Sequence, residues 1–315
     1  MSKQISFVIP CCNEVGNVRD IYQVIRRVFS EEGISFECVM IDDGSTDGTG
    51  EALKALYHDV TAWTLKVIRF SRNFGKEAAI YAGLHYADAD HICVIDADLQ
   101  QRPEVALAMY RKLLEAPEYD SACAYVERRN EGKRLNFFKG AFYRLVNRLS
   151  ETGFVNGASD FRIISRRMAD AILSMPEYYR FSKGIFSWVG FETLYLPYQP
   201  EKRQSGTSKW SFFKLFRYAM EGIIGYSVSP LRLASVLGLL FTFASVVMLL
   251  VLLVRDLSGL VNGAGMLPSA LILLTGGIIM VLLGIMGEYL ARTYIQGKNR
   301  PVYIIKEILE GDQNG

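Results

Sequence analysis

Short apolar runs alternate with longer amphipathic stretches along the first part of the chain. The apolar runs, each typical of a buried β-strand, are Ile5 to Pro10, Phe36 to Asp42, Leu65 to Phe70 and Ile92 to Asp96. Stretches with helical periodicity begin near Gly16, Thr46, Gly75 and Pro103. Strands that alternate with helices build βαβ units, so the pattern predicts an α/β fold in which helices cover both faces of a mostly parallel sheet.

Two much longer apolar segments lie further along, from Leu233 to Val254 and from Leu267 to about Gly287. Each has about twenty residues without a charge, enough to cross a bilayer core as a transmembrane helix. Basic residues flank the pair on both outer sides, which places both ends in the cytoplasm. Between about Ser208 and Tyr226, aromatic and basic residues interleave as in amphipathic helices of the headgroup region, although a helix packed on the soluble domain is an alternative.

These patterns divide the chain into four parts: an α/β domain at 1–203, juxtamembrane amphipathic helices at 204–230, two transmembrane helices at 231–291 and a cytoplasmic tail at 292–315. The amino terminus lacks the features of a signal peptide, so we expect a multi-pass protein of the inner (cytoplasmic) membrane with both termini and the α/β domain in the cytoplasm. The five cysteines, none in C-x-x-C spacing, are expected as reduced core thiols. Glycines at Gly276, Gly277, Gly284 and Gly287 predict a homo-oligomer.

Composition and charge exclude some functions. With 315 residues, 50% of them hydrophobic, and a formal charge of only +2, the chain gives no basis for binding nucleic acid. A channel or transporter is disfavoured because neither apolar segment holds a charge inside it, Glu288 lying at an edge.

Polar residues follow every one of the four predicted strands. They are Asn13-Glu14, Asp42-Asp-Gly-Ser45, Ser71-Arg-Asn73 and Asp96-Ala-Asp98. Any one of these segments could be an ordinary turn, but the carboxyl ends of parallel strands open onto the ligand cleft of such sheets. Two carboxylates one residue apart at that edge are suited to hold a hard divalent cation against a phosphate. The pattern therefore predicts a site for a nucleotide diphosphate.

The chain resembles the family 2 glycosyltransferases of the GT-A fold, a Rossmann-like architecture, and among them the polyprenyl-phosphate glycosyltransferases that include dolichol-phosphate mannose synthase and the bactoprenol glucosyltransferases. The segments that carry this resemblance, followed by two spans after Pro230, are Val8-Ile-Pro-Cys-Cys-Asn-Glu14, Ile41-Asp-Asp-Gly-Ser-Thr-Asp47, Ser71-Arg-Asn-Phe-Gly-Lys-Glu-Ala-Ala79, Asp96-Ala-Asp-Leu-Gln100, Ser159-Asp-Phe-Arg162, Phe181-Ser-Lys-Gly-Ile-Phe-Ser-Trp-Val-Gly-Phe191 and Arg203-Gln-Ser-Gly-Thr-Ser-Lys209.

The resemblance assigns roles to residues on the donor side. It implies that Asp43 lies at the nucleotide base or ribose and that Asp98 and Asp160 are catalytic; Asp160 could orient the acceptor, act as base or fix Arg162. The nucleotide-binding set that it implies is Pro10, Asn13, Glu14, Asp43, Lys76 and Asp96. The ligands that it implies for Mg²⁺ or Mn²⁺ are Asp96, Asp98 and Gln100.

On the acceptor side, the family uses a lipid monophosphate, which is already anionic at neutral pH and needs cationic groups more than a strong base. The residues expected to contact the acceptor phosphate or the pyrophosphate are Arg128, Arg134, Arg162, Arg203, Ser205 and Lys209. A solvated basic loop is the alternative for Arg128 and Arg134, and a membrane-surface linker for the segment that begins at Arg203.

The resemblance implies an inverting, metal-dependent transfer of one hexose, glucose from UDP-glucose, to undecaprenyl phosphate at the cytoplasmic leaflet. UDP-N-acetylglucosamine and GDP-mannose are alternative donors. The chain has Asp98-Leu-Gln-Gln-Arg-Pro103 where relatives commonly have Asp-Leu-Gln-Asp-Pro-Pro, and this departure suggests a third alternative, a membrane-bound scaffold with a decayed active site.

Overall fold

The computed structural model describes residues 3–60, 64–126, 158–199, 229–258 and 266–311. The chain separates into two compact units. Of the described residues, the first comprises 3–60, 64–126, 158–199 and 301–311, and the second comprises 229–258 and 266–300. The unit that carries the sheet therefore contains both the first and the last described residues.

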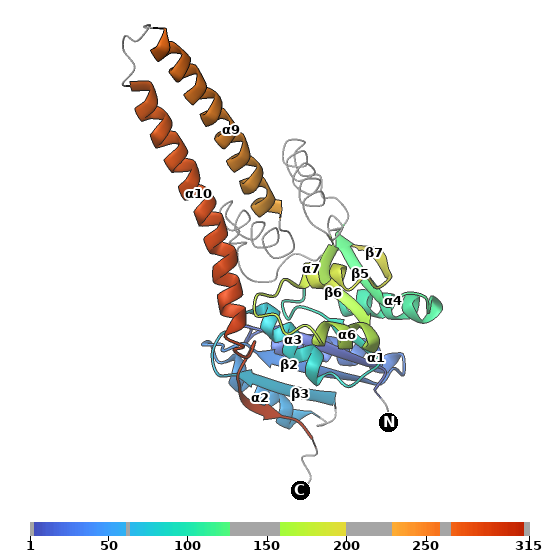
Figure 1. Cartoon of the computed structure of the whole chain (residues 1–315). Coiled ribbons are helices and arrows are strands. Elements are labelled where there is room, and N and C mark those ends of the chain that lie inside the picture. The colour runs from blue at the N-terminus through green and yellow to red at the C-terminus, as the bar shows by residue number, and fades with distance from the viewer. Residues whose placement is uncertain (1–2, 61–63, 127–157, 200–228, 259–265, 312–315) are drawn as a thin grey trace. The chain divides into compact units, whose positions relative to one another are not determined.

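The first unit is built on an eight-stranded sheet in the order β7-β5-β6-β4-β1-β2-β3-β8 (Figure 1). The strands are β1 (Ile5–Cys11), β2 (Phe36–Asp42), β3 (Leu65–Phe70), β4 (His91–Val94), β5 (Ser121–Val126), β6 (Ala158–Ser165), β7 (Thr193–Tyr198) and β8 (Ile305–Leu309). Its helices are α1 (Val18–Glu31), α2 (Thr49–Asp59), α3 (Lys76–Tyr86), α4 (Pro103–Glu115), α6 (Arg166–Leu173) and α7 (Ser182–Trp188).

The four central strands run parallel, since β1 pairs with β2 and β4, and β2 pairs with β3. The order of these strands reverses between β1 and β4, the kind of position at which α/β sheets place a ligand cleft. β6 and β8 run antiparallel to their neighbours β4 and β3. Because β6 is antiparallel, its first residues lie beside the carboxyl end of β4.

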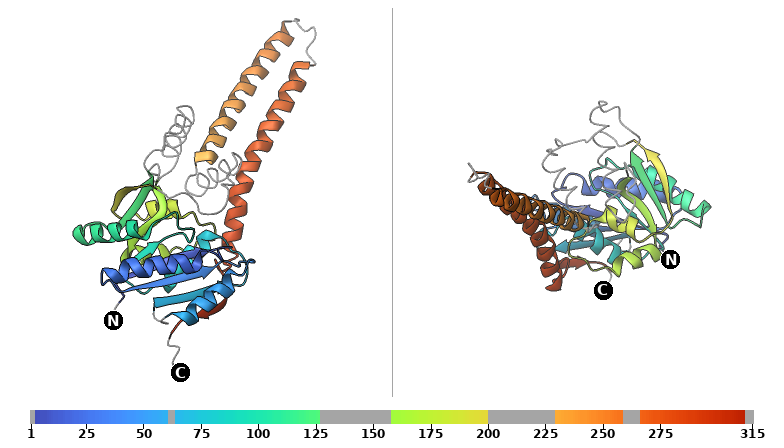
Figure 2. Two further views of the ribbon diagram at one scale, coloured as in Figure 1. Left: turned by 180° about the vertical axis from the view of Figure 1, so that it is seen from behind. Right: turned by 45° about the horizontal axis from the view of Figure 1, so that its top comes forward.

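Helices cover both faces of the sheet (Figure 2). Helices α1, α2 and α4 pack together over one face, where Phe7 and Met40 are fully buried. Helix α3 covers the other face so closely that a Cβ atom on Gly83 would lie 2.2 Å from Cγ1 of Val8. Burial of these alternating side chains supplies the main driving force for the fold. The predicted α/β architecture, with its mostly parallel sheet, is confirmed.

The four predicted strands and helices all form, with small differences at their ends. β4 stops at Val94, so Asp96 lies in the loop beyond it rather than at the last position of a strand. Helix α2 starts after Gly48, and Asp47 accepts a hydrogen bond from the Thr49 amide, whereas Thr46 bonds to Asn13 instead.

The segment expected as a cytoplasmic tail, 292–315, contains strand β8. This strand pairs with the outer edge of β3, and Leu309 packs against the hydrophobic core. The sequence pattern did not indicate it, because a five-residue strand at a sheet edge has little periodicity of its own. The end of the chain is thus part of the α/β domain.

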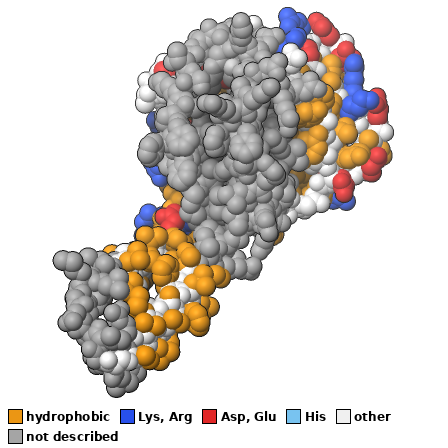
Figure 3. All heavy atoms as spheres, turned by 90° about the horizontal axis from the view of Figure 1, so that it is seen from above, with side chains coloured by type: hydrophobic (Ala, Val, Ile, Leu, Met, Phe, Trp, Pro, Cys, Tyr) orange, Lys and Arg blue, Asp and Glu red, His pale blue; other side chains and the backbone are white. Residues whose placement is uncertain are grey.

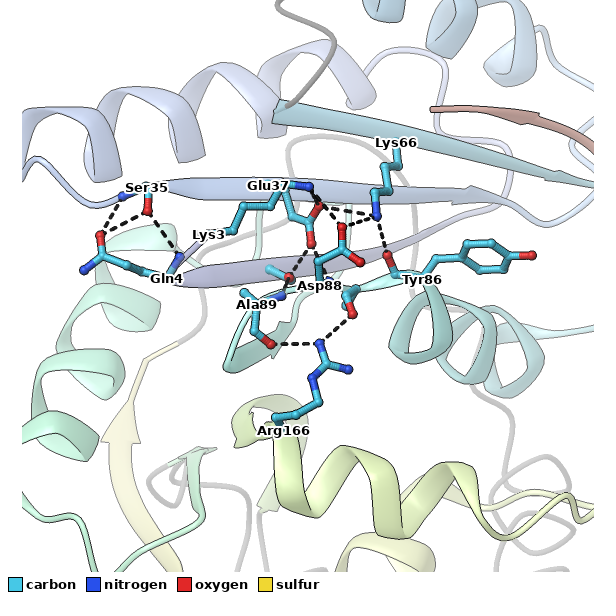
Figure 4. Close-up of polar contacts among 11 residues, drawn as sticks. Lys3, Gln4, Ser35, Glu37, Lys66, Tyr86, Asp88, Ala89 and Arg166 are labelled. Carbon is cyan, nitrogen blue, oxygen red and sulfur yellow. Dashed lines mark hydrogen bonds and ion pairs between the residues drawn. The ribbon is translucent and has the colours of Figure 1, made fainter. Parts of the chain in front are cut away.

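A buried carboxylate, Glu37, anchors the end of the sheet opposite to the predicted cleft (Figure 4). It accepts hydrogen bonds from the Ser6 hydroxyl at 2.6 Å and from the Asp88 amide at 2.7 Å, and it forms ion pairs with Lys3 and Lys66. A buried charge is stable only when it is paired and hydrogen-bonded, so this network joins the starts of β1, β2 and β3 to the turn before β4.

The second unit holds two long helices, α9 (Ser229–Leu257) and α10 (Met266–Gly297). Among the described residues, the stretch Leu274–Gly297 is long and apolar enough to cross a membrane, while the apolar stretch Val236–Met248 in α9 is shorter. Hydrophobic side chains cover the described surface of this pair (Figure 3). One candidate span is therefore found, and the second predicted span stays a prediction.

Candidate active site

Two carboxylates and one lysine meet where β4 and β6 lie side by side, and a third carboxylate lies nearby. The Lys76 ammonium group, in the first turn of α3, is 2.6 Å from Oδ1 of Asp96 and 3.3 Å from Oδ2 of Asp160. Asp96 follows β4, and Asp160 lies near the start of β6. Asp98 is close enough to act on the charge of Asp96. The structure thus brings together four of the residues that the sequence selected.

The charges of this cluster oppose one another. Burial raises the pKa of Asp96, and Lys76 only partly counteracts it. Burial also raises the pKa of Asp160, but the positive charges of Lys76, Lys183 and Arg162 outweigh this effect, so the pKa is lowered. Between the two carboxylates, the pKa of Lys76 is raised despite burial. The lowered pKa makes Asp160 a weak base at neutral pH, so it is better suited to orient cationic groups than to remove a proton.

The departure at Gln101 has a structural role. Its side-chain oxygen accepts from the Asp96 amide at 2.8 Å, and its side-chain amide donates to Oδ2 of Asp96 at 3.1 Å. An aspartate could not make the second bond while ionised. Arg102 points its guanidinium to Glu104 on the surface, 3.4 Å away. Gln101 therefore holds the loop after β4 in place, and Arg102 makes a surface ion pair outside it.

The carboxylates fit a divalent cation of the Mg²⁺ or Mn²⁺ type. Oδ1 of Asp160 is buried and has no hydrogen-bond donor among the described residues. Carboxylate oxygens are hard ligands, and Mg²⁺ is usually held by one or two of them together with substrate phosphates and water. Within the described ranges, no group of three His, Cys, Asp or Glu side chains is placed to hold a metal ion by itself, so a cation here would also need oxygens of the donor or of water.

The loops after β1, β2 and β3 interlock beside this cluster. Asp43 accepts hydrogen bonds from the backbone amides of Phe74 at 2.6 Å and Gly75 at 2.9 Å. Burial raises the pKa of Asp43, and these amides oppose the shift. Gly44 has φ of +63°, and a Cβ atom there would be 2.4 Å from the backbone of Arg72. Both of its properties, left-handed backbone and close approach, require glycine.

Asn13 and Glu14 hold the same region together through their backbone amides and the side chain of Asn13. The Asn13 amide donates to the Ser45 hydroxyl at 3.0 Å, and its side-chain oxygen accepts from the Thr46 amide at 2.9 Å. Asn13 has φ of +59°, a conformation that asparagine tolerates. The Glu14 amide donates to Thr49 at 2.9 Å. Pro10, near the end of β1, pairs with Ile41.

Arg162 lies inside the domain, only 5% exposed. Its guanidinium stacks 3.9 Å above the ring of Phe186 in α7 and donates to the Ser159 carbonyl at 2.9 Å, while its Nε has no hydrogen-bond partner among the described residues. This arrangement places a positive charge beside Asp160. The predicted contact of Arg162 with a phosphate stays a prediction.

The remaining acceptor residues predicted from the sequence lie outside the described residues. They are Arg128, Arg134, Arg203, Ser205 and Lys209. Sequence reasoning also gave no role to several described residues that surround the carboxylates. Lys183 acts on the charge of Asp160, and Tyr198, at the end of β7, lies near Asp96 and Asp98. Lys183 belongs to a segment that carries the resemblance, but no signal in the sequence distinguished Tyr198.

Glu77 joins α3 to α7 and is a third residue to which the sequence analysis gave no role. Its carboxylate accepts from both the backbone amide (2.8 Å) and the hydroxyl of Ser182, the first residue of α7. Burial raises the pKa of Glu77 to about 7, and Asp160 adds to the shift. Since Lys183 follows Ser182, this contact fixes the lysine that faces Asp160.

The pH dependence of stability should report the burial of Glu77. A carboxyl whose pKa is raised in the folded state contributes stability that is present below pH 4.5 and is lost as pH rises through about 7. Glu77→Gln keeps a neutral side chain at every pH, so we expect it to gain about 1–2 kcal/mol relative to the unchanged protein between pH 5 and pH 8. Thermal unfolding in detergent measures this difference; parallel pH curves for the two proteins would contradict it.

Comparison with known proteins finds similar chains among glycosyltransferases. Residues 6–173 match the profile of Glycosyl transferase family 2. The chain is 36% identical over 308 residues to the prophage bactoprenol glucosyl transferase homolog of Escherichia coli (strain K12), covering 97% of this chain and 99% of that protein. It is 35% identical over 312 residues to the bactoprenol glucosyl transferase of Shigella phage SfII, covering 98% and 99%.

A solved structure shows the same fold at low sequence identity. Mannosyl-3-phosphoglycerate synthase from Rubrobacter xylanophilus superposes with a TM-score of 0.50 and 21% identity, covering 70% of this chain and 71% of that one.

Proposed function

The chain belongs to glycosyl transferase family 2, and from that premise we propose that it transfers a single hexose, glucose from UDP-glucose, to undecaprenyl phosphate with inversion at the anomeric carbon. The observation that carries this proposal is the meeting of Asp96 and Asp160 with Lys76 at the carboxyl edge of the sheet, with Asp98 close enough to affect the pKa of Asp96. Oxygen ligands and a fixed cation in one place suit the departure of a nucleoside diphosphate. The names of the full-length relatives support a bactoprenol acceptor.

Asp96, Asp98 and Gln100 would hold Mg²⁺ or Mn²⁺ on the donor, and the bound cation would supply charge neutralisation for the leaving nucleotide. Lys76 would also neutralise the charge of the leaving nucleotide, because it stays protonated between two carboxylates. Asp43 and the loops around it would hold the nucleotide. The acceptor phosphate is anionic and attacks directly, so Asp160 serves as an orienting anion for Lys76 and Arg162.

The scaffold alternative rested on Gln101 and Arg102. Since Gln101 holds Asp96 by two hydrogen bonds and Arg102 is paired at the surface, neither residue argues for a decayed site. The alternative donors UDP-N-acetylglucosamine and GDP-mannose stay open to experiment.

Membrane attachment by two spans is part of the proposal. Strands β1 to β7 precede α9 in the sequence and strand β8 follows α10, yet all of them belong to one sheet. The segment that contains α9 and α10 must therefore leave and return on the same side of a bilayer. An even number of crossings satisfies this condition, which supports a helical hairpin of α9 and α10 in the cytoplasmic membrane. Open space around Gly276, Gly277, Gly284 and Gly287 is compatible with self-association.

The test is transfer of label to lipid. Purified protein, undecaprenyl phosphate and Mn²⁺ are incubated with radiolabelled UDP-glucose, UDP-N-acetylglucosamine or GDP-mannose, and label in the organic phase is counted. We expect glucose to be transferred, the reaction to stop in EDTA, and excess Mn²⁺ or Mg²⁺ to restore it. Transfer that proceeds equally in EDTA would refute the metal requirement, and a different preferred sugar would replace glucose.

A further inference from the structure

Strand β8, at the end of the chain, contacts the strand that leads into the candidate nucleotide site. It pairs antiparallel with β3, with Arg69 opposite Glu307. Just beyond β3, the Ser71 amide donates to the Ile304 carbonyl at 2.9 Å. The loop that begins at Ser71 carries the amides that bind Asp43. The carboxyl end of β3 is therefore held from the outer edge of the sheet.

A series of polar contacts connects β8 to the loops after β1 and β2. Nη1 of Arg69 is 3.1 Å from Glu307, and Nε of Arg69 is 3.3 Å from Oδ2 of Asp42. Oδ1 of Asp42 accepts from the Ser45 amide at 3.0 Å, and the Ser45 hydroxyl accepts from the Asn13 amide at 3.0 Å. Each of these contacts involves a charged group or a backbone amide, and hydrogen bonds to charged groups are the stronger ones.

The geometry of Arg69 depends on its partners. Its side chain is 15% exposed and that of Asp42 is 4% exposed. A Cβ atom on Gly50 would lie 2.2 Å from Nη2 of Arg69, so the guanidinium packs against the backbone of α2. Glu51 is a third carboxylate within reach, at 3.2 Å. Loss of Glu307 would leave Arg69 to redistribute between Asp42 and Glu51 and shift the loop that Asp42 holds.

A series of aromatic contacts forms a second connection from the segment before β8 to the same region. The ring of Tyr303 stacks on Phe70, with centroids 5.1 Å apart and an interplanar angle of 11°. Phe70 meets Phe74 edge to face at 5.7 Å, and the Phe74 amide is a donor to Asp43. Tyr303 also contacts Tyr81 of α3 at 6.3 Å. Two sets of contacts thus link the segment around β8 to the loops of the candidate nucleotide site: the polar set reaches Ser45 and Asn13, and the aromatic set reaches Phe74, which binds Asp43.

We propose that β8 and the residues just before it, through Glu307 and Tyr303, position the nucleotide-binding loops, so that affinity for the nucleoside diphosphate of the donor depends on a segment that follows the apolar helices. This inference rests on the proposed function, because it takes the loops around Asp43 as the nucleotide site. Glu307 and Tyr303 are positioning residues, since both act through Arg69 or Phe70.

A matched pair of variants separates positioning from general stability. Glu307 also pairs with Lys54 at 2.9 Å, so Lys54→Met removes one salt bridge of Glu307 and leaves its contact with Arg69. We expect Glu307→Gln to raise the Kd for UDP, measured by calorimetry with Mn²⁺ in the full-length protein, about three- to tenfold. Lys54→Met should stay within about twofold. Donor KM should follow the Kd for UDP, whereas acceptor KM should not change.

Tyr303 gives a second, independent test. Tyr303→Phe keeps the ring on Phe70, so this variant should bind UDP as the unchanged protein does. Tyr303→Leu removes the ring, so its Kd for UDP should rise by about three- to tenfold, roughly the effect of one aromatic contact. Equal Kd values for Glu307→Gln and Lys54→Met, or for Tyr303→Leu and Tyr303→Phe, would overturn the inference. Failure of the unchanged protein to bind UDP would instead count against the proposed function.

Discussion

Replacing Asp98 by asparagine should reduce the rate of hexose transfer by about 10²- to 10³-fold, because it removes one anionic ligand that would balance the charge of the cation and the leaving diphosphate. Asp98→Asn removes the charge of this side chain and leaves the neighbouring hydrogen bonds in place. Oδ1 of Asp98 accepts a hydrogen bond from the Gln100 amide at 3.1 Å, and asparagine keeps an oxygen for this bond. The contacts of Asp96 with Lys76 and Gln101 are untouched.

The matched control is Asp59→Asn, the same chemical change on the surface. Asp59 pairs with Arg19, and both side chains are about half exposed, so little stability is at stake. Transfer rates and Mn²⁺ binding, followed by electron paramagnetic resonance, should fall for Asp98→Asn and stay unchanged for Asp59→Asn. An Asp98→Asn protein with normal Mn²⁺ affinity and normal transfer would show that Asp98 is not a metal ligand.

Replacing Gly44 by alanine should weaken nucleotide binding by at least about tenfold and should destabilise the α/β domain by about 2–4 kcal/mol. The new Cβ would lie 2.4 Å from backbone atoms of Arg72 and Asn73, which cannot rotate away as a side chain would. The loops after β2 and β3 would have to separate, and Asp43 would then lose its amide donors.

Gly33 provides the control for backbone strain. It has φ of +68°, close to the +63° of Gly44, but nothing lies within 4 Å of a Cβ atom there. Gly33→Ala should therefore cost only the strain of the left-handed conformation, about 1–2 kcal/mol, and leave UDP affinity unchanged. Thermal unfolding and UDP titration of both variants make the comparison. Equal losses at the two positions would show that the close approach at Gly44 has no role in the site.

The sequence by itself determined the parallel core and its rim. Hydrophobic periodicity is a local property, so the four strands and the helices that follow them could be recognised from neighbouring residues alone. In a parallel sheet the carboxyl ends of strands meet, and for this reason Asn13, Asp43, Asn73 and Asp96 could be placed at one edge without coordinates. The resemblance to the family added the order and spacing of these segments.

Only the tertiary structure decided which distant residues complete the site. Lys76 and Asp160 are 84 residues apart, and no periodicity joins them; they meet because β6 runs antiparallel to β4. Arg69 and Glu307 are 238 residues apart, and they meet because the segment after α10 returns to the free edge of β3. Strand pairing between remote segments is set by sheet topology and shared burial rather than by local pattern, and a short edge strand carries almost no local signal.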